Sequence, residues 1–446
     1  MKVLEAYQKA FASLPAKIRE AEVEAETLAE TTVVFQNGER QGNAASDVTE
    51  LFVRASGEKT GFTYTQNLEE DPLEVLKRAY ESSAYSQAEK PERMNGSAEG
   101  GTFTEPACES LPSAVLEEKA AEIDRWLAAQ EPGLEIRMIT VTDRVRTLGI
   151  VNTKGLLAQT SGRVLSVVLD AVEGSEMFQQ ECTFRSVEEI PASLFEKGLK
   201  KWRSMQLPEV PFASGTYPCV IDGSVMANIL LTSWRMFSGV NYLAGSTPFA
   251  GKLGQRVGNE TLRISDKAEQ KGSGYRFALD CEGTAGADQP LVKDGILTGL
   301  MHDLATAEKM DTASTGNAGR KAMISGNIHT DVQVIPRNFA IEPGTVSLEE
   351  LLSHMGNGIY LYESFDQFHS INTASGDYSI PCSGILIENG KMAGRIRGLT
   401  INGRVQELLA GIEEAADDLF VLPMLMLNSY TVASPSVRVT ALNVSQ

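Results

Sequence analysis

The sequence predicts an α+β protein, with a helix-and-sheet N-terminal region followed by a larger β-rich C-terminal domain. The chain has 446 residues, more than one hydrophobic core usually organises, so two or three domains are expected. Hydrophobic residues make up 42% and charged residues 22%, which is the composition of an ordinary folded globular protein. Alternating apolar and polar residues around turn signals occupy most of the chain, and helical spacing is confined to a few segments.

The N-terminal α+β domain is predicted to span residues 1–90. Apolar positions recur at helical spacing in residues 1–26, and no unbroken apolar run of the kind that a secretory signal needs is present there. Residues 31–65 then alternate apolar and polar positions and predict a meander of strands. Asp71 followed by Pro72 predicts the start of a second helix, because Asp caps helices and Pro fits the first turn.

A linker and a middle section are predicted to follow. Residues 91–112 are rich in Glu, Gly, Ser, Pro and Thr and have few apolar anchors, so we expect a linker there. The middle α+β section, residues 113–207, should begin with a helix, continue with strands and close with a helix over residues 192–205. The apolar stripe of its first helix consists of Leu116, Ala120, Ile123 and Leu127.

The β-rich C-terminal domain is predicted to span residues 215–446. It should open with a strand and a helix over residues 224–238, and then continue as strands and turns. The clearest local signal is the pair Asn389-Gly390 after an apolar run. Both residue types tolerate positive φ, so this pair predicts a two-residue type I′ hairpin turn.

Charge and cysteine content limit the classes of function. A formal net charge of -19 and a pI of about 4.8 disfavour direct binding to nucleic acid. The densest basic run, residues 197–203, is expected to form one face of a helix. The five cysteines are odd in number and widely spaced, which argues against a disulfide framework. The longest apolar stretches are too short to cross a membrane, so we expect a cytoplasmic protein.

Motifs for metal or nucleophile chemistry are missing from the sequence. The four histidines, His302, His329, His354 and His369, are too far apart to form a HExxH-type zinc helix. No serine lies in a GxSxG motif, and no cysteine has a recognisable protease context. We therefore predict no catalytic, cofactor-binding or metal-binding residue in this chain.

Two carboxylate pairs remain as candidates for acid–base chemistry. They are Asp280 with Glu282, and Asp377 with Glu388. The alternative is that these side chains cap turns and accept hydrogen bonds from backbone amides at strand ends. We favour the turn-capping interpretation, because neither pair has a recognisable second catalytic partner.

Several blocks in the C-terminal half resemble the TldD/PmbA family, once called modulators of DNA gyrase. The blocks occur in the family order, and together with a looser N-terminal match the resemblance covers most of the chain. They are GSTPFAGKLGQRV (245–257), FALDCEGT (277–284), DGILTGLMHDLATAEKM (294–310), STGNAGR (314–320) and SGDYSIPCSGILIENGK (375–391).

The resemblance implies the non-catalytic, PmbA- or TldE-like branch of this family. Catalytic members hold zinc with two histidines of a HExxxH helix and a cysteine near the C-terminus. The matching helix here, residues 224–238, has no His, Glu, Asp or Cys, and no cysteine follows Cys382. Zinc is therefore expected in a TldD-like catalytic partner subunit.

Together the two subunits would enclose a chamber for extended, unfolded peptides, which would dock by strand addition. Family members are linked to maturation of microcin-type peptides and to degradation of antitoxins. A homodimer is a further possibility for the free chain. Two other hypotheses also stay open: a regulatory binding protein that acts on DNA gyrase, and a hydrolase with an unrecognised site.

Candidate cleft-lining residues come from the strongest of these blocks. They are Gly316, Asn317, Gly376, Asp377 and Ser379. Gly, Asn and Asp are also the residues that turns require, so turn geometry is an equal alternative for each.

Overall fold

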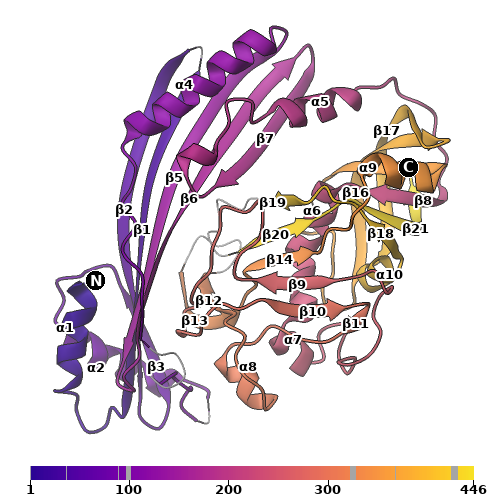
Figure 1. Cartoon of the computed structure of the whole chain (residues 1–446). Helices are drawn as coiled ribbons and strands as arrows, with labels where there is room; N and C mark the ends of the chain where they lie inside the picture. The colour runs from indigo at the N-terminus through magenta and orange to yellow at the C-terminus, as the bar shows by residue number, and fades with distance from the viewer. Residues whose placement is uncertain are drawn as a thin grey trace.

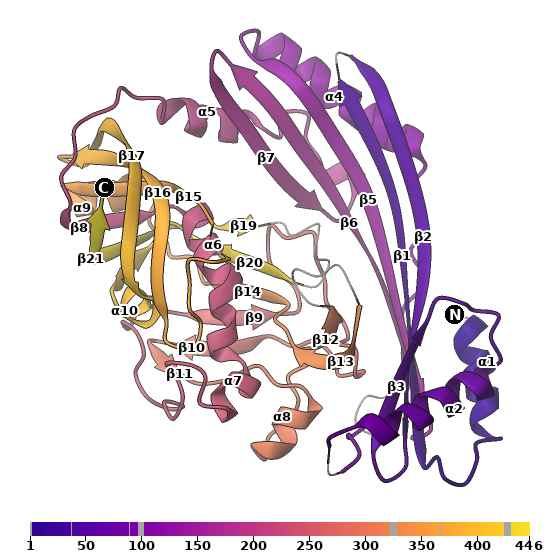
Figure 2. The same ribbon diagram turned by 180° about the vertical axis from the view of Figure 1, so that it is seen from behind.

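The computed structural model describes residues 2–36, 38–88, 90–96, 102–321, 328–366, 368–422 and 430–446. Figures 1 and 2 show a long curved sheet that carries helices on its outer face, beside a compact C-terminal domain. The predicted α+β class, with its helix-and-sheet N-terminal region and β-rich C-terminal domain, is confirmed.

The large sheet combines strands from both sides of the predicted linker. Its strand order is β3-β2-β1-β5-β6-β4, and β7 pairs with β6. β1 pairs with β5 from Glu22 opposite Asn152 to Phe35 opposite Ile139, so the sections predicted as 1–90 and 113–207 share one sheet. The strands are β1 (Glu20–Gln36), β2 (Glu39–Ser56), β3 (Thr60–Thr65), β4 (Thr102–Thr104), β5 (Glu135–Asn152), β6 (Leu157–Glu173) and β7 (Glu176–Phe184).

The predicted linker also takes part in this sheet. Its strand β4 pairs with β6 in parallel, from Thr102 opposite Leu157. Asn95 is buried and donates from its side-chain nitrogen to the carbonyl of Glu282, at 2.9 Å, in the C-terminal domain. Residues 97–101 of the predicted linker lie outside the described residues.

The helices of the N-terminal region follow the sequence signals closely. The Asp71 side chain caps α2 by accepting a hydrogen bond from the Leu73 amide at 3.0 Å. All four residues of the predicted apolar stripe are buried in α4. These elements are α1 (Lys2–Phe11), α2 (Pro72–Ser82), the 3-10 helix η1 (Ser83–Tyr85), α4 (Ser113–Gln130), the 3-10 helix η2 (Val187–Glu189) and α5 (Glu196–Ser204).

The helical spacing predicted over residues 1–26 is wrong beyond Phe11, because β1 begins at Glu20. In the segment EAEVEAE, Ala21, Val23 and Ala25 pack against α1 and α2. The intervening glutamates lie on the opposite face of the strand, since successive side chains of a strand alternate. That face is turned toward the C-terminal domain. On it, Glu22 pairs with Arg54 of the neighbouring strand β2, and Glu24 pairs with Arg320 of the C-terminal domain.

The C-terminal domain is built from two six-stranded sheets that lie on either side of α6 (Gly223–Ser233). The strand orders are β11-β10-β9-β14-β20-β19 and β17-β16-β15-β8-β21-β18, and β12 pairs with β13. The strands are β8 (Gly215–Ile221), β9 (Ile264–Lys267), β10 (Gln289–Lys293), β11 (Ile296–Leu297), β12 (Ala318–Lys321), β13 (Ile328–Val334), β14 (Asn338–Ile341), β15 (Gly358–Ser364), β16 (Asp377–Glu388), β17 (Lys391–Arg404), β18 (Ile412–Ala415), β19 (Phe420–Leu422), β20 (Thr431–Ser434) and β21 (Val437–Ser445). The other helices are the 3-10 helix η3 (Trp234–Phe237), α7 (Gly239–Leu243), α8 (Leu304–Lys309), α9 (Leu348–Met355) and α10 (Val405–Ala410).

The predicted hairpin turn lies between β16 and β17. Glu388 is opposite Lys391 in the ladder, and the two residues between them have φ values of 50° at Asn389 and 76° at Gly390. Positive φ at both central residues is the requirement of a type I′ turn, so the Asn-Gly prediction is confirmed.

This turn provides a first testable prediction. A Cβ added at Gly390 would lie 2.9 Å from Ser353 Cα, whereas Gly398, with φ 69°, has open space around it. Both substitutions to alanine strain the backbone, but only Gly390→Ala adds a steric clash. We expect Gly390→Ala to lower the free energy of unfolding by about 1 kcal/mol more than Gly398→Ala, measured by urea denaturation. Equal losses in the two variants would contradict this.

All five cysteines are free. Across the described part of the chain, we find no helix that combines the length and the apolar character needed to span a bilayer.

Candidate functional site

Helix α6 lies between the two sheets of the C-terminal domain. The sequence predicted a helix over residues 224–238, and the structure has α6 over Gly223–Ser233 followed by η3 over Trp234–Phe237. Helix α6 packs against β20, β19 and β15, and most of its residues are buried. The buried positions of its middle turns are apolar: Val225, Met226, Ala227, Ile229, Leu230 and Leu231. The helix is therefore a core helix with no ionisable side chain.

The start of α6 is tied to the segment that leads in from the large sheet. Asp222 caps the helix by accepting a hydrogen bond from the Ser224 amide at 3.0 Å. Its other carboxylate oxygen accepts from Lys201 of α5 and from the Tyr360 hydroxyl. Burial alone would raise the pKa of Asp222, but Lys201 and these hydrogen bonds outweigh it and lower that pKa. The predicted basic run of α5 is thus partly used to hold the C-terminal domain.

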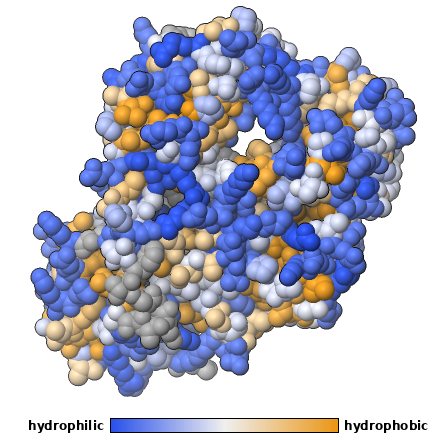
Figure 3. All heavy atoms as spheres, viewed as in Figure 1, coloured by the Kyte–Doolittle hydropathy of each residue, from blue (hydrophilic) through white to orange (hydrophobic). Residues whose placement is uncertain are grey.

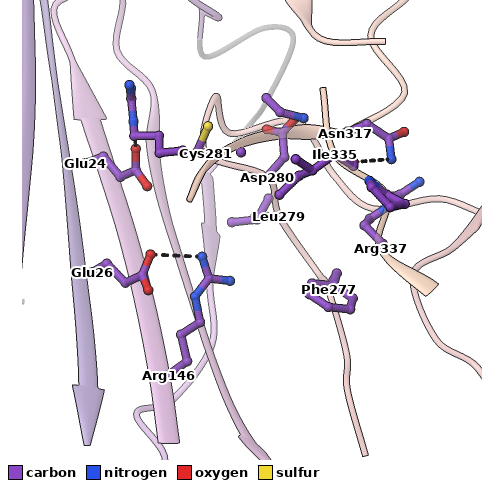
Figure 4. A pocket seen from close by; sticks show the side chains of 15 residues that line it. Glu24, Glu26, Arg146, Phe277, Leu279, Asp280, Cys281, Asn317, Ile335 and Arg337 are labelled. Atoms are coloured by element: carbon purple, nitrogen blue, oxygen red, sulfur yellow. Dashed lines mark hydrogen bonds and ion pairs between the residues drawn. The ribbon is translucent and has the colours of Figure 1, made fainter. Parts of the chain in front are cut away.

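A small cavity of about 40 Å³ lies where the inner face of the large sheet meets the C-terminal domain. Figure 4 shows the side chains that line it, with Glu24, Glu26 and Arg146 on one side and Asp280, Asn317 and Arg337 on the other. The structure brings two of the predicted site residues, Gly316 and Asn317, together with Asp280 in the wall of this cavity.

Ion pairs line this junction, and those of Arg54 with Glu282 and of Arg320 with Glu24 cross it. Arg54, whose side chain is 1% exposed, binds Glu22 at 2.7 Å, and its Nη1 atom lies 3.3 Å from Glu92 and 3.7 Å from Glu282. Arg320 of β12 pairs with Glu24. Arg146 of β5 pairs with Glu26 of β1 at 3.1 Å within the sheet itself. The contact surface between the large sheet and the C-terminal domain is therefore held by buried charges.

The carboxyl groups of Asp280 and Glu282 are anchored by backbone amides. Asp280 accepts hydrogen bonds from the amides of Glu282, Thr284 and Ala318 at 2.8–3.1 Å. Glu282 accepts from the Leu304 amide at 2.8 Å. Burial raises the pKa of both groups well above the ordinary values of carboxyl groups. The hydrogen bonds of Asp280 are those that the turn-capping interpretation predicts.

The other predicted site residues lie at the start of β16. Asp377 accepts hydrogen bonds from Arg404 at 3.1 Å and from the Ser375 hydroxyl at 2.7 Å. Ser379 is hydrogen-bonded to Asn402 at 2.8 Å. Gly376 has φ 85°, and a Cβ there would meet Gln406 at 1.9 Å. Their role in lining a substrate cleft stays a prediction.

The second carboxylate pair is not a pair in space. Asp377 is the first residue of β16 and Glu388 is the last. A strand advances roughly 3.3 Å per residue, so the two carboxylates are separated by roughly 30 Å or more. They cannot act on one substrate atom.

The histidine side chains that the structure describes have separate local partners. His302 is buried and its Nδ1 lies 3.2 Å from Thr306 Oγ1, while His354 and His369 pair with Glu414 and Asp366. The side chain of His329 lies outside the described part. Over the described residues, no group of three or more His, Cys, Asp or Glu side chains is placed to hold a metal ion.

A larger cleft, of about 590 Å³, lies between β7 and the C-terminal domain. Its walls include Glu181 and Thr183 of β7, the loop 269–273, and Phe420 of β19. Figure 3 shows an opening between the upper part of the large sheet and the C-terminal domain. No sequence motif marks this cleft, because its walls come from three distant segments that only the fold brings together.

Comparisons with known proteins place these features in context. A family model described as the PmbA/TldA metallopeptidase C-terminal domain matches residues 214–446, and a model for PmbA/TldA metallopeptidase domain 1 matches residues 21–83. A metalloprotease of Methanothermobacter thermautotrophicus is 24% identical over 69% of this chain and 68% of its own length. A TldD homolog of Haemophilus influenzae is 25% identical over 82% of this chain and 78% of its own length. A PmbA homolog of the same organism is 26% identical, and the chain spans about half of it (53%).

Two solved structures share the fold over the whole chain. TldE from Thermococcus kodakarensis superposes with a TM-score of 0.83 at 19% identity and covers 100% of both chains. A Thermotoga maritima protein, described as a modulator of a DNA gyrase, superposes with a TM-score of 0.80 at 22% identity, over 99% of this chain and 100% of its own.

Proposed function

Because this chain belongs to the TldD/PmbA family of metallopeptidases, we propose that it is the non-catalytic, TldE-like subunit of a zinc metallopeptidase that acts on unfolded peptides. The proposal depends mainly on one feature, the side-chain composition of α6. In the catalytic members that the sequence resembles, the corresponding helix supplies two histidines to zinc. In this chain the same helix is part of the hydrophobic core.

The residues of α6 do not fit a zinc ion. Protein zinc sites use Cys, His, Asp or Glu as ligands, and none of these occurs between Gly223 and Ser233. The last cysteine, Cys382, is buried in β16, where burial raises the pKa of its thiol to about 12. A zinc ligand must be a thiolate, so this cysteine is also a poor donor. Zinc and the hydrolytic step are therefore assigned to a TldD-like partner subunit.

The shape of the chain suits a subunit that helps to enclose a substrate. The inner face of the curved sheet carries no helix among the described residues and faces the C-terminal domain across an opening (Figures 1 and 3). A narrow opening of this kind favours extended, unfolded peptides over folded proteins. The partner would complete the enclosure, and the complex would work in the cytoplasm.

The test is a metal analysis and a peptidase assay on the purified chain, alone and mixed with a TldD-like subunit from the same organism. We expect substoichiometric zinc and no cleavage from the chain alone, and cleavage of unfolded peptides in the mixture. A matched control is a mixture in which one zinc-ligand histidine of the partner is replaced by alanine, which should be inactive.

Each other outcome points elsewhere. Stoichiometric zinc or cleavage by the chain alone would sink the proposal and favour a hydrolase with its own site. Inactivity of a mixture that forms a stable complex would also count against it, and co-purification of gyrase subunits instead would favour the regulatory hypothesis.

A further inference from the structure

The cleft of about 590 Å³ is bounded on one side by an edge strand. Within the part of the chain that the structure describes, β7 pairs with β6 along one edge and with no strand along the other. Figures 1 and 2 both place β7 at the margin of the large sheet, on the side of the C-terminal domain. Edge strands present unpaired N–H and C=O groups, which are a template for another strand. At nine residues, β7 is long enough to receive one.

The C-terminal domain contacts β7 at both ends and leaves the middle of its edge open. The Gly274 amide donates to Thr183 Oγ1 at 3.0 Å, and a Cβ on Gly274 would lie 2.8 Å from the carbonyl oxygen of Phe184. The loop before Gly274 and the short strand β19, itself the edge of its sheet, form the remainder of the wall. At the other end, Glu176 pairs with Arg395 and Arg397 of β17 at 3.5 Å. The open part of the β7 edge is therefore Met177 to Cys182, of which Gln180 to Cys182 line the cleft.

Two buried acceptors in this cleft lack hydrogen-bond partners. Gln270 is 6% exposed, and its Oε1 atom has no partner among the described residues. The same holds for Oε1 of Glu181. Because side chains alternate along a strand, Glu181 lies on the same face of β7 as Thr183, the face that meets the C-terminal loop. Burial raises the pKa of Glu181 to about 7, while Ser166 and Arg144 lower it.

The charges around Glu181 leave it as the acidic group that a ligand would meet. Arg185 and Arg276 both pair with Glu269, at 2.7 Å and 2.9 Å. Arg144 pairs with Glu30. These arginines are thus already paired. Lys271 of the loop 269–273 is exposed and also lines the cleft, so a cationic group of a ligand would complement Glu181 on the β7 side.

We infer that this cleft binds an extended peptide, which adds as a strand to the open edge of β7 and places a lysine or arginine side chain against Glu181. Strand addition satisfies the free backbone groups of β7, and the donors of the peptide supply partners for Glu181 and Gln270. The class of ligand rests on the proposed function, whereas the site rests on the cleft itself. The non-catalytic subunit would then hold the substrate and not only enclose it.

The binding is tested on the full isolated chain, without a partner subunit. The probe is a fluorescein-labelled, unstructured peptide of about twelve residues with a central lysine, and its affinity is measured by fluorescence anisotropy. Two further versions carry N-methyl groups on alternate residues, one in each frame. We expect one methylated frame to abolish binding and the other to retain it, because only alternate amides of an added strand face β7.

Hydrogen exchange locates the bound peptide. We expect amides between Met177 and Cys182 to become protected, whereas protection confined to other segments would overturn the assignment. Similar affinities for both methylated frames would exclude strand addition. The mixture with a TldD-like subunit provides a further check. If it cleaves the same peptide at concentrations where the isolated chain does not bind it, this inference is refuted and the proposed function stays intact. Binding to the isolated chain, together with no cleavage in the mixture, would support this inference and count against the proposed function.

The charge contact is tested with a matched pair of variants. Glu181→Gln keeps the shape of the side chain, and we expect it to weaken the lysine peptide about tenfold and a glutamine-substituted peptide little. Glu188→Gln removes the same charge from an exposed position of η2 outside the cleft wall, so it should leave both affinities unchanged. Equal losses in the two variants would show general attraction to an acidic protein and would contradict the contact with Glu181.

Discussion

Replacing Arg54 by methionine is expected to lower the free energy of unfolding by about 3–5 kcal/mol, the cost of breaking a buried ion pair from one side. The Arg54 side chain is 1% exposed and its guanidinium serves Glu22, Glu92 and Glu282. Methionine fills much of the volume but leaves the buried carboxylate of Glu22 without a cation. The measurement is denaturation by guanidinium chloride at pH 7.

Two companion variants separate charge from packing. Arg276→Met removes an arginine whose side chain is 39% exposed and which pairs with Glu105 and Glu269, so a loss below about 1 kcal/mol is expected. The double variant Arg54→Met/Glu22→Gln should regain part of the stability, because the orphaned carboxylate is then neutral. If Arg54→Met costs no more than Arg276→Met, the junction is not held by this ion pair.

Between pH 5 and pH 8 the free energy of unfolding of the wild-type protein is expected to fall, and that of the Glu282→Gln variant is expected to fall less. Burial raises the pKa of Glu282 in the folded chain. When the pKa of a carboxyl group is higher in the folded state than in the unfolded state, the stability that the group contributes is fully present at low pH. That contribution is lost as the pH rises from the unfolded pKa through the folded one.

The expected size of this effect follows from the burial of the group. A fully buried carboxyl can shift by roughly 3 pKa units, and each unit is worth about 1.4 kcal/mol. Asp280 shares the effect, so we expect the variant to lose about 2–4 kcal/mol less than the wild type between pH 5 and pH 8. Unfolding free energies from urea titrations at several pH values would measure it.

Glu308→Gln provides the control for this pH series. Glu308 is exposed, and hydrogen bonding to Lys90 lowers its pKa, so its titration is complete below the tested range. This variant should follow the wild-type curve between pH 5 and pH 8. A parallel curve for Glu282→Gln as well would show that Glu282 is already ionised in the folded protein at pH 5.

Local signals in the sequence predicted the elements whose structure is decided locally. Asp71 caps α2, the apolar stripe of α4 is buried, and the turn at Gly390 has positive φ. Each depends on residues within one or two turns of each other. The start of β1 was misjudged because the apolar residues of 1–26 were assigned helical spacing throughout, although glutamate at every second position from Glu20 has the period of a strand. The arginines that neutralise these glutamates are as far away in the chain as Arg320.

The candidate sites also depend on contacts between distant parts of the chain, which the sequence alone does not indicate. The sequence singled out Gly316, Asn317 and Asp280, and the structure brings them to one junction. It did not predict that Glu24 and Glu26 face them from β1, because nothing within a strand indicates which sheet face another domain will cover. The β7 cleft was missed for a related reason, since whether a strand ends at a sheet edge depends on the pairing of the whole sheet.

The pairing of β1 with β5 has a consequence for how the protein is made. The side chains of Glu22 and Asn152 meet although they are 130 positions apart in the chain. On a ribosome that has completed α4 but not β5, β1 has one long edge with no strand to cover it. Unpaired edges of this length are prone to associate with other chains. Fragments that end between α4 and β5 should therefore aggregate, and expression of the N-terminal part alone is expected to need a chaperone or to fail.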